Sequence, residues 1–151
     1  MNEDKTFCPN ILILEDNEDD ILVTKRAFEK DPVFNGTLFI VENGIEALDF
    51  LYNRNKYSDP KQFPKPDLIL VDINMPMMNG IEFLKTIKEV PEFKTIPSII
   101  LSSSQNNQDI QKCYSLGASG YIVKPVSFLR FKEVIHQFNE YWQNNEIIKK
   151  G

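Results

Sequence analysis

Short apolar segments recur along the chain, and none of them alternates strictly with polar residues. They are rich in Ile, Leu and Val, and polar or turn residues follow each one. This pattern is typical of short strands that are covered on both faces, as in parallel sheets. The predicted strands are residues 11–14, 38–41, 68–71, 99–101 and 121–123.

Between these strands, apolar residues return at three- and four-residue spacing, which indicates amphipathic helices. A weaker and more polar helix is expected over residues 108–116, and Ser127 is the expected N-cap of the last helix. The residues that mark the helical faces are Ile21, Leu22 and Phe28, then Ile45, Leu48, Leu51 and Tyr52, then Phe83, Leu84 and Ile87, and finally Phe131, Val134, Ile135, Phe138 and Trp142.

Strand and helix alternate five times, which predicts a doubly wound α/β domain with helices on both faces of a parallel sheet. Sites in such domains form where the strands end, at their carboxyl edge. Polar residues that can carry chemistry stand at four of the predicted strand ends: Glu15 and Asp16, Asp72, Ser102, and Lys124.

Three carboxylates in one small region repel one another unless a cation joins them. Mg²⁺ suits such a site because it prefers oxygen ligands and commonly binds through one or two carboxylates and a phosphate. A carboxylate beside Mg²⁺ and a lysine is able to attack phosphorus, while the two cations stabilise the transferred charge. The strand ends therefore predict phosphoryl transfer to an aspartate.

Composition narrows the class of protein. The chain has 151 residues, 42% of them hydrophobic, which fits one domain with its own core. A net charge of −5 disfavours nucleic acid and anionic membranes as partners. No apolar run is long enough to span a bilayer, and residues 1–10 lack a signal sequence. With two cysteines and no disulfide framework, a cytoplasmic location is expected.

Four motifs follow predicted strands in order: "ILILEDN", "LILVDINMPMMNG", "IPSIILSSS" and "GASGYIVKP". With them the chain resembles the receiver domain of two-component response regulators. The expected receiver domain is residues 8–143, with tails at 1–7 and 144–151 and no output domain. The long segment 53–66 and the aromatic last helix are similar to the single-domain regulators associated with phytochrome-type kinases.

The resemblance implies a flavodoxin-like fold with strand order 2-1-3-4-5. It also implies that Asp72 is the phosphoacceptor. Mg²⁺ would be held by the side chains of Asp16 and Asp72, by the backbone carbonyl of Asn74, and by Glu15 largely through water. Glu15 stands where the family usually has Asp, and it keeps the carboxylate.

For the phosphorylated state, the resemblance implies that Lys124 pairs with the phosphate and that Ser102 donates its hydroxyl to it. Ser102 replaces the commoner Thr and keeps the hydroxyl. Tyr121 would change rotamer with Ser102. The peptide bond between Lys124 and Pro125 is expected to be cis.

The implied partners are a sensor histidine kinase or phosphotransfer protein and a downstream protein target, and a homodimer is also allowed. No enzymatic activity is expected beyond self-phosphorylation from small donors and self-dephosphorylation. Two alternatives use the same architecture. A phosphatase with an aspartyl nucleophile would want a second Asp at Asn74, and a flavin carrier would want a phosphate-binding loop where this chain has acids. The acids Glu18, Asp19 and Asp20 are expected to be a solvated helix start, with Asp20 as a candidate cap.

Overall fold

The computed structural model describes residues 8–73, 77–124 and 127–144, without the side chains of residues 138 and 141–144. Five parallel strands form one sheet in the order β2-β1-β3-β4-β5. This confirms the expected fold class and strand order. The strands are β1 (Asn10–Leu14), β2 (Thr37–Val41), β3 (Leu68–Asp72), β4 (Ser98–Ser102) and β5 (Gly120–Val123), each within one residue of its predicted bounds.

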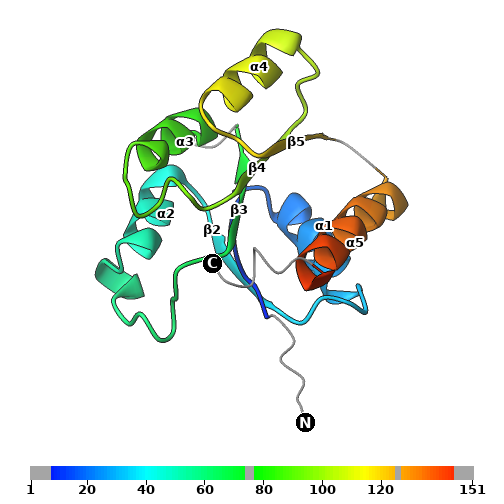
Figure 1. The fold of residues 1–151 in the computed structure, drawn as a ribbon, viewed down its shortest axis with the longest axis horizontal. Coiled ribbons are helices and arrows are strands. Elements are labelled where there is room, and N and C mark those ends of the chain that lie inside the picture. The colour runs from blue at the N-terminus through cyan, green and yellow to red at the C-terminus, as the bar shows by residue number, and fades with distance from the viewer. Residues whose placement is uncertain (1–7, 74–76, 125–126, 145–151) are drawn as a thin grey trace.

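The helices lie on both faces of the sheet (Figure 1). They are α1 (Glu18–Glu29), α2 (Gly44–Leu51), α3 (Gly80–Lys88), α4 (Asn107–Ser115) and α5 (Phe128–Asn144), with a 3₁₀ turn, η1 (Asn55–Tyr57), after α2. Among the described residues, no helix is long and apolar enough to cross a membrane.

The sheet separates two cores, because alternate residues of each strand point to opposite faces. On one face, Ile11 and Ile13 of β1 pack with residues of α1 and α5. On the other, Leu12 and Leu14 pack with residues of α2, α3 and α4. The central strands β1, β3 and β4 are buried almost throughout, whereas the edge strands β2 and β5 are largely half-buried.

Three residues that were expected on buried helical faces are exposed instead. Leu22, Ile45 and Tyr52 are 49%, 44% and 41% exposed. In α1 the buried face includes Ala27 and Phe28, so Leu22 lies on the solvent side. Tyr52 is the C-cap of α2, and its ring contacts the ring of Phe93 from the edge of the core. The spacing rule identified these helices correctly, but the buried face that it predicted for them was too wide.

The segment 53–66 is largely exposed and is attached to the core through Tyr57 and Phe63. Tyr57 is buried, and its ring and that of Phe63 pack against Phe50. Asn53 adopts a positive φ of 54°, and its Nδ2 donates to the carbonyl oxygens of Tyr57 and Phe63. The Tyr57 hydroxyl donates to the carboxylate of Glu46. These contacts explain how a long connection is accommodated in a compact domain.

A polar contact joins the end of α1 to α5. Asp31 is buried, and its carboxylate accepts hydrogen bonds from His136 Nδ1 at 2.9 Å and from Asn139 Nδ2 at 3.1 Å. Burial alone would raise the pKa of Asp31, but the hydrogen bonds from His136, from the Val33 amide and from Asn139 lower it. The hydrogen bond to Asp31 in turn raises the pKa of His136. The lone histidine, His136, thus links α5 to the loop that follows α1.

Candidate functional site

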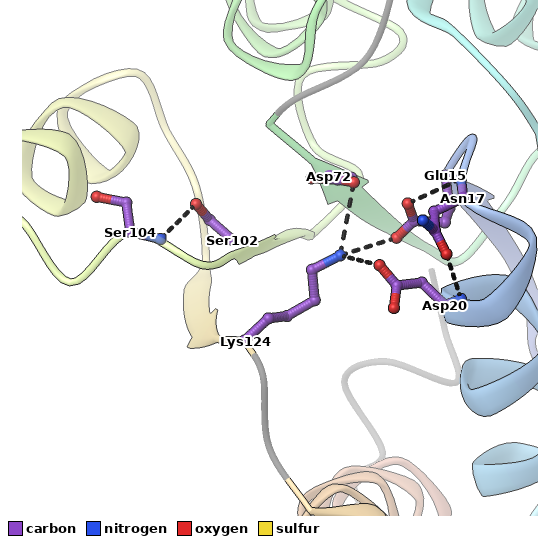
Figure 2. A network of polar contacts seen from close by, with 7 residues as sticks. All are labelled: Glu15, Asn17, Asp20, Asp72, Ser102, Ser104 and Lys124. Atoms are coloured by element: carbon purple, nitrogen blue, oxygen red, sulfur yellow. Dashed lines mark hydrogen bonds and ion pairs between the residues drawn. The ribbon is translucent and has the colours of Figure 1, made fainter.

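The polar residues at the strand ends meet at the carboxyl edge of the sheet (Figure 2). Asp72 and Ser102 are the last residues of β3 and β4, Glu15 and Asp16 follow β1, and Lys124 follows β5. Parallel pairing brings them together: Leu14 pairs with Val71, Asp72 pairs with Leu101, and Ser102 pairs with Val123. This convergence is the one predicted from the sequence.

Three of these residues form a group that we call the acid trio: Glu15, Asp16 and Asp72. Each offers a carboxylate oxygen, and the three oxygens lie within 4.8 Å of one another. Glu15 and Asp72 are buried, whereas Asp16 is exposed. Carboxylate oxygens at this separation are a donor set that suits a hard divalent cation such as Mg²⁺.

Without a cation, the trio carries unfavourable charge. Burial, together with the neighbouring Asp72 carboxyl, raises the pKa of Glu15 to about 7, although Lys124 opposes this shift. The metal-free site therefore favours a proton on Glu15 at a pH where a carboxyl group is ordinarily ionised. The three carboxylates of the trio repel one another in this arrangement, which is expected of a site that binds a cation.

Lys124 is the positive residue of the site. Its Nζ lies 3.1 Å from Glu15 Oε1, 3.0 Å from Asp20 Oδ2 and 3.5 Å from Asp72 Oδ2. Burial alone would lower the pKa of Lys124, but the hydrogen bond to Asp20 and the charges of Asp72 and Glu15 raise it. Lys124 is therefore held as an ammonium beside Asp72.

The start of α1 differs from the expectation. Asn17, not Asp20, is the N-cap, and its side chain accepts the backbone N–H of Asp20 at 2.9 Å. The Asn17 backbone N–H donates to Glu15 Oε2 at 3.3 Å. With the cap supplied by Asn17, the carboxylate of Asp20 is available to pair with Lys124. Asp20 thus belongs to the site. The sequence predicted only a solvated helix start at this position and gave no sign of the contact with Lys124.

On the other side of Asp72, Ser102 connects to the start of α4. Ser102 Oγ accepts the backbone N–H of Ser104 at 3.1 Å, and Ser104 Oγ donates to Asp109 Oδ2 at 2.6 Å. The Tyr121 hydroxyl donates to the Ser104 carbonyl oxygen at 3.0 Å. Ser104 therefore touches Ser102, Tyr121 and α4. The triple serine "SSS" was the only sequence signal for it, and that signal does not distinguish its members.

A cleft of about 440 Å³ opens over the acids and Lys124. One wall is polar, and the other is apolar and lies between α1 and α5. The lining residues are Glu15, Asp16, Asn17, Asp20, Val23, Thr24, Asp72, Leu101, Ser103, Lys124 and Phe131. The cleft therefore leads from solvent to the largely buried Asp72.

Gly80 fixes α3 against the backbone of the site. A Cβ atom at Gly80 would lie 2.3 Å from the Asp72 carbonyl oxygen and 2.8 Å from Val71 Cγ1. Only glycine permits this approach, since every other residue would collide with the backbone of β3. Gly80 is the first residue of α3, and it packs on the backbone of Asp72.

Three expectations fall on parts of the chain that the structure does not describe. One is the aromatic face of the last helix, because the side chains of Phe138 and Trp142 are not described. Asn74, the expected backbone ligand, and Pro125, the second residue of the expected cis peptide bond, lie outside the described residues.

Known proteins resemble this chain over most of its length. The family model of the response regulator receiver domain matches residues 11–136. Response regulator Rcp1 of Synechocystis sp. is 30% identical over 132 residues, which cover 87% of this chain and 87% of Rcp1.

Solved structures agree with this. The phosphorylated cyanobacterial phytochrome response regulator RcpA superposes with a TM-score of 0.81 at 31% identity, over 91% of this chain and 96% of that one. The Mn²⁺-bound form of Rcp1 gives a TM-score of 0.78 at 28% identity, over 91% and 96% of the two chains.

The fold, the strand-end constellation and these relatives agree. The chain belongs to the response regulator receiver domain family of two-component signalling, and it is similar to response regulators associated with phytochromes, RcpA among them.

Proposed function

We propose that Asp72 is the phosphoacceptor of this receiver domain. The observation that supports this most directly is the placement of Asp72 between the other acids and Lys124, at the floor of an open cleft. Its Oδ2 lies 3.5 Å from Lys124 Nζ, so a cation already lies beside the place where a phosphoryl group on Asp72 would carry its charge.

In the proposed transfer, a carboxylate oxygen of Asp72 attacks phosphorus in line with the leaving group. The new O–P bond gives an acyl phosphate. The P–N bond of a phosphohistidine donor breaks, and its electron pair stays with the imidazole nitrogen. Lys124 stabilises the charge that gathers on the phosphoryl oxygens, which is most of what this reaction asks of a protein.

The acid trio fits Mg²⁺, which when bound supplies positive charge to the transferred group. We propose that Asp16 and Asp72 are direct ligands, together with the Asn74 carbonyl, and that Glu15 acts largely through water. The raised pKa of Glu15 supports a site shaped for a cation, because the buried carboxylates lack enough positive charge without one. A Mn²⁺-bound structure of Rcp1 is consistent with a divalent cation in this family.

The proposed output is a switched surface formed by α4, β5 and α5. Ser102 would turn its hydroxyl to the phosphate and release the Ser104 amide that it now accepts. The Ser104 carbonyl oxygen accepts the hydrogen bond of the Tyr121 hydroxyl, so a movement of Ser104 would also displace Tyr121. Complete population reversal needs about 5.5 kcal/mol of differential binding, which a few charge-assisted hydrogen bonds at roughly 1.5–3 kcal/mol each supply.

The proposed partners follow from this chemistry. A sensor histidine kinase or a phosphotransfer protein would donate the phosphoryl group, and a downstream protein would recognise the switched surface. A second copy of the chain is a further candidate for that surface. Receiver domains are generally phosphoacceptors and not enzymes, so turnover would be limited to self-phosphorylation and self-dephosphorylation.

Incubation of the wild-type protein with acetyl phosphate, followed by intact mass measurement, tests the proposal. One phosphoryl group should be gained in Mg²⁺ and none after chelation. A protein that stays unlabelled in Mg²⁺, while another receiver domain is labelled in the same buffer, would contradict the phosphoacceptor role.

The switch is tested separately by Ser102→Ala. This variant keeps Asp72, the acid trio and Lys124, so it should still be phosphorylated. It lacks the hydroxyl that favours the active arrangement, at a cost of about 1 kcal/mol in that equilibrium. NMR spectra should therefore show smaller phosphorylation-dependent amide shifts around Tyr121 than in the wild type. Ser115→Ala, at the far end of α4, is the matched control and should behave as wild type. Equal shifts in all three proteins would show that Ser102 does not couple the site to Tyr121.

A further inference from the structure

Asp20 is the site residue whose role is not explained by the acid trio. It lies in the first turn of α1, and its Oδ2 is 3.0 Å from Lys124 Nζ. Figure 2 shows it approaching the ammonium from the α1 side, whereas Asp72 approaches from β3. Asp20 does not belong to the group of carboxylates that is able to share a metal ion. Its contact in the site is with the lysine.

We propose that Asp20 is a positioning residue that holds the Lys124 ammonium in place, with one N–H directed toward Asp72. The inference rests on the proposed function, since it concerns how Lys124 is prepared for the phosphoryl group.

The donor count of the ammonium supports this. An ammonium has three N–H donors. Two of them make hydrogen bonds, at 3.1 Å to Glu15 Oε1 and at 3.0 Å to Asp20 Oδ2. The Asp72 oxygen lies at 3.5 Å, within ion-pairing distance but longer than these two bonds. The two shorter contacts fix the nitrogen and leave the third donor for an acceptor at Asp72.

Asp20 remains a partner of Lys124 when a cation and a phosphoryl group occupy the site. Glu15 belongs to the acid trio, so a bound cation competes with Lys124 for its charge. Asp20 lies outside the trio, and its backbone N–H is held by the Asn17 cap. It therefore keeps the lysine near Asp72 in the state that receives the phosphoryl group. Holding a donor in advance lowers the reorganisation needed as charge develops.

The competing interpretation gives the opposite result. If Asp20 draws Lys124 away from the phosphate, its removal should accelerate phosphorylation. The distances disfavour this, because Nζ reaches Asp20 and Asp72 from one position and need not leave one to approach the other.

The experiment compares Asp20→Asn with Asp19→Asn. Asp19 is the exposed neighbour in the same turn of α1, so both variants remove one negative charge from nearly the same place. Each variant therefore lowers the repulsion between the protein and an anionic phosphoryl donor by a similar amount. With acetyl phosphate at saturating Mg²⁺, Asp20→Asn should be phosphorylated about fivefold more slowly than Asp19→Asn. Asp20→Glu, which keeps the charge, should recover most of the rate.

Two further measurements separate positioning from a general structural effect. In a Lys124→Gln background, Asp20→Asn should slow the reaction no more than Asp19→Asn does, because the residue that it positions is gone. In metal-free protein, ¹³C relaxation at Lys124 Cε should show a more mobile side chain in Asp20→Asn than in Asp19→Asn. This second readout does not depend on phosphorylation.

Equal rates in Asp20→Asn and Asp19→Asn, or a faster rate in Asp20→Asn, would overturn the positioning role while leaving Asp72 as phosphoacceptor. A loss of Mg²⁺ affinity specific to Asp20→Asn would also overturn it, because Asp20 would then act on the metal site. Failure of the wild type to become labelled is the distinct result that contradicts the proposed function itself.

Discussion

Asp72→Asn is expected to abolish phosphorylation of the protein by acetyl phosphate. The amide lacks the anionic oxygen that attacks phosphorus, and no other group of the site replaces it at the same position. The variant should fold, because an amide is close in size to the carboxylate and removes repulsion from Glu15, whose pKa is raised in part by Asp72. Intact mass measurement should give one added phosphoryl group in the wild type and none in Asp72→Asn.

Asp19→Asn serves as the control, because it makes the same chemical change at an exposed position of α1 and should be labelled fully. Persistent labelling of folded Asp72→Asn would place the nucleophile on another residue, and peptide mapping of the labelled protein would identify it.

Asp16→Ala is expected to lower Mg²⁺ affinity by more than about 100-fold and to stop phosphorylation with it. Asp16 offers one of the few direct ligand oxygens, and an octahedral Mg²⁺ site with few protein ligands has none to spare. Glu15→Gln removes a residue that is expected to act through water, so its loss of affinity should be nearer 10-fold. Isothermal titration of metal-free protein with Mg²⁺ measures both. Equal losses in the two variants would contradict this ranking of the ligands.

The pH dependence of the same titration isolates Glu15. Its pKa is raised to about 7 in the metal-free protein, so it is mostly protonated below that pH and ionised above it. The ionised form attracts the cation, and binding therefore releases a proton near neutral pH. Wild-type affinity should fall as the pH is lowered from 8 to 6. In Glu15→Gln this part of the dependence should disappear. A wild-type affinity that does not change over this range would show that Glu15 does not titrate with the metal.

The sequence predicted the sheet well because its strands are buried on both faces. Short apolar runs such as "ILIL" and "LILV" are typical of buried strands in a domain of this size. The polar residues after each run mark where the strand ends. The helices were located but their faces were not fixed, as the exposed Leu22 and Ile45 show. In a helix one extra apolar residue beside the buried stripe costs little, so the pattern is less strict than in a strand.

The acid trio, Ser102 and Lys124 were predictable as neighbours because the fold brings strand ends together, whatever lies between them in sequence. Asp20 and the pair Asp31–His136 were not. Each contact joins α1 or its end to a residue more than 100 positions later, at 104 and 105 residues respectively. Acids at a helix start are usually solvated, and a single histidine carries no partner in its own sequence. These roles become visible only in the fold, where α1 packs against α5 and Lys124 reaches the start of α1.

The half-buried edge strand β5 has a further consequence for how long a signal lasts. Asp72 lies on a central strand with a partner on each side, whereas Lys124 follows a strand bonded on one side only. Edge strands open locally at a lower free energy than central ones. The two halves of the site therefore differ in how often their amides exchange with solvent. A phosphoryl group on Asp72 that pairs with Lys124 would link the two strands, and local opening of β5 would move Lys124 away from it. In the proposed phosphorylated state, the local stability of β5 would therefore influence how long Lys124 stays paired with the phosphate.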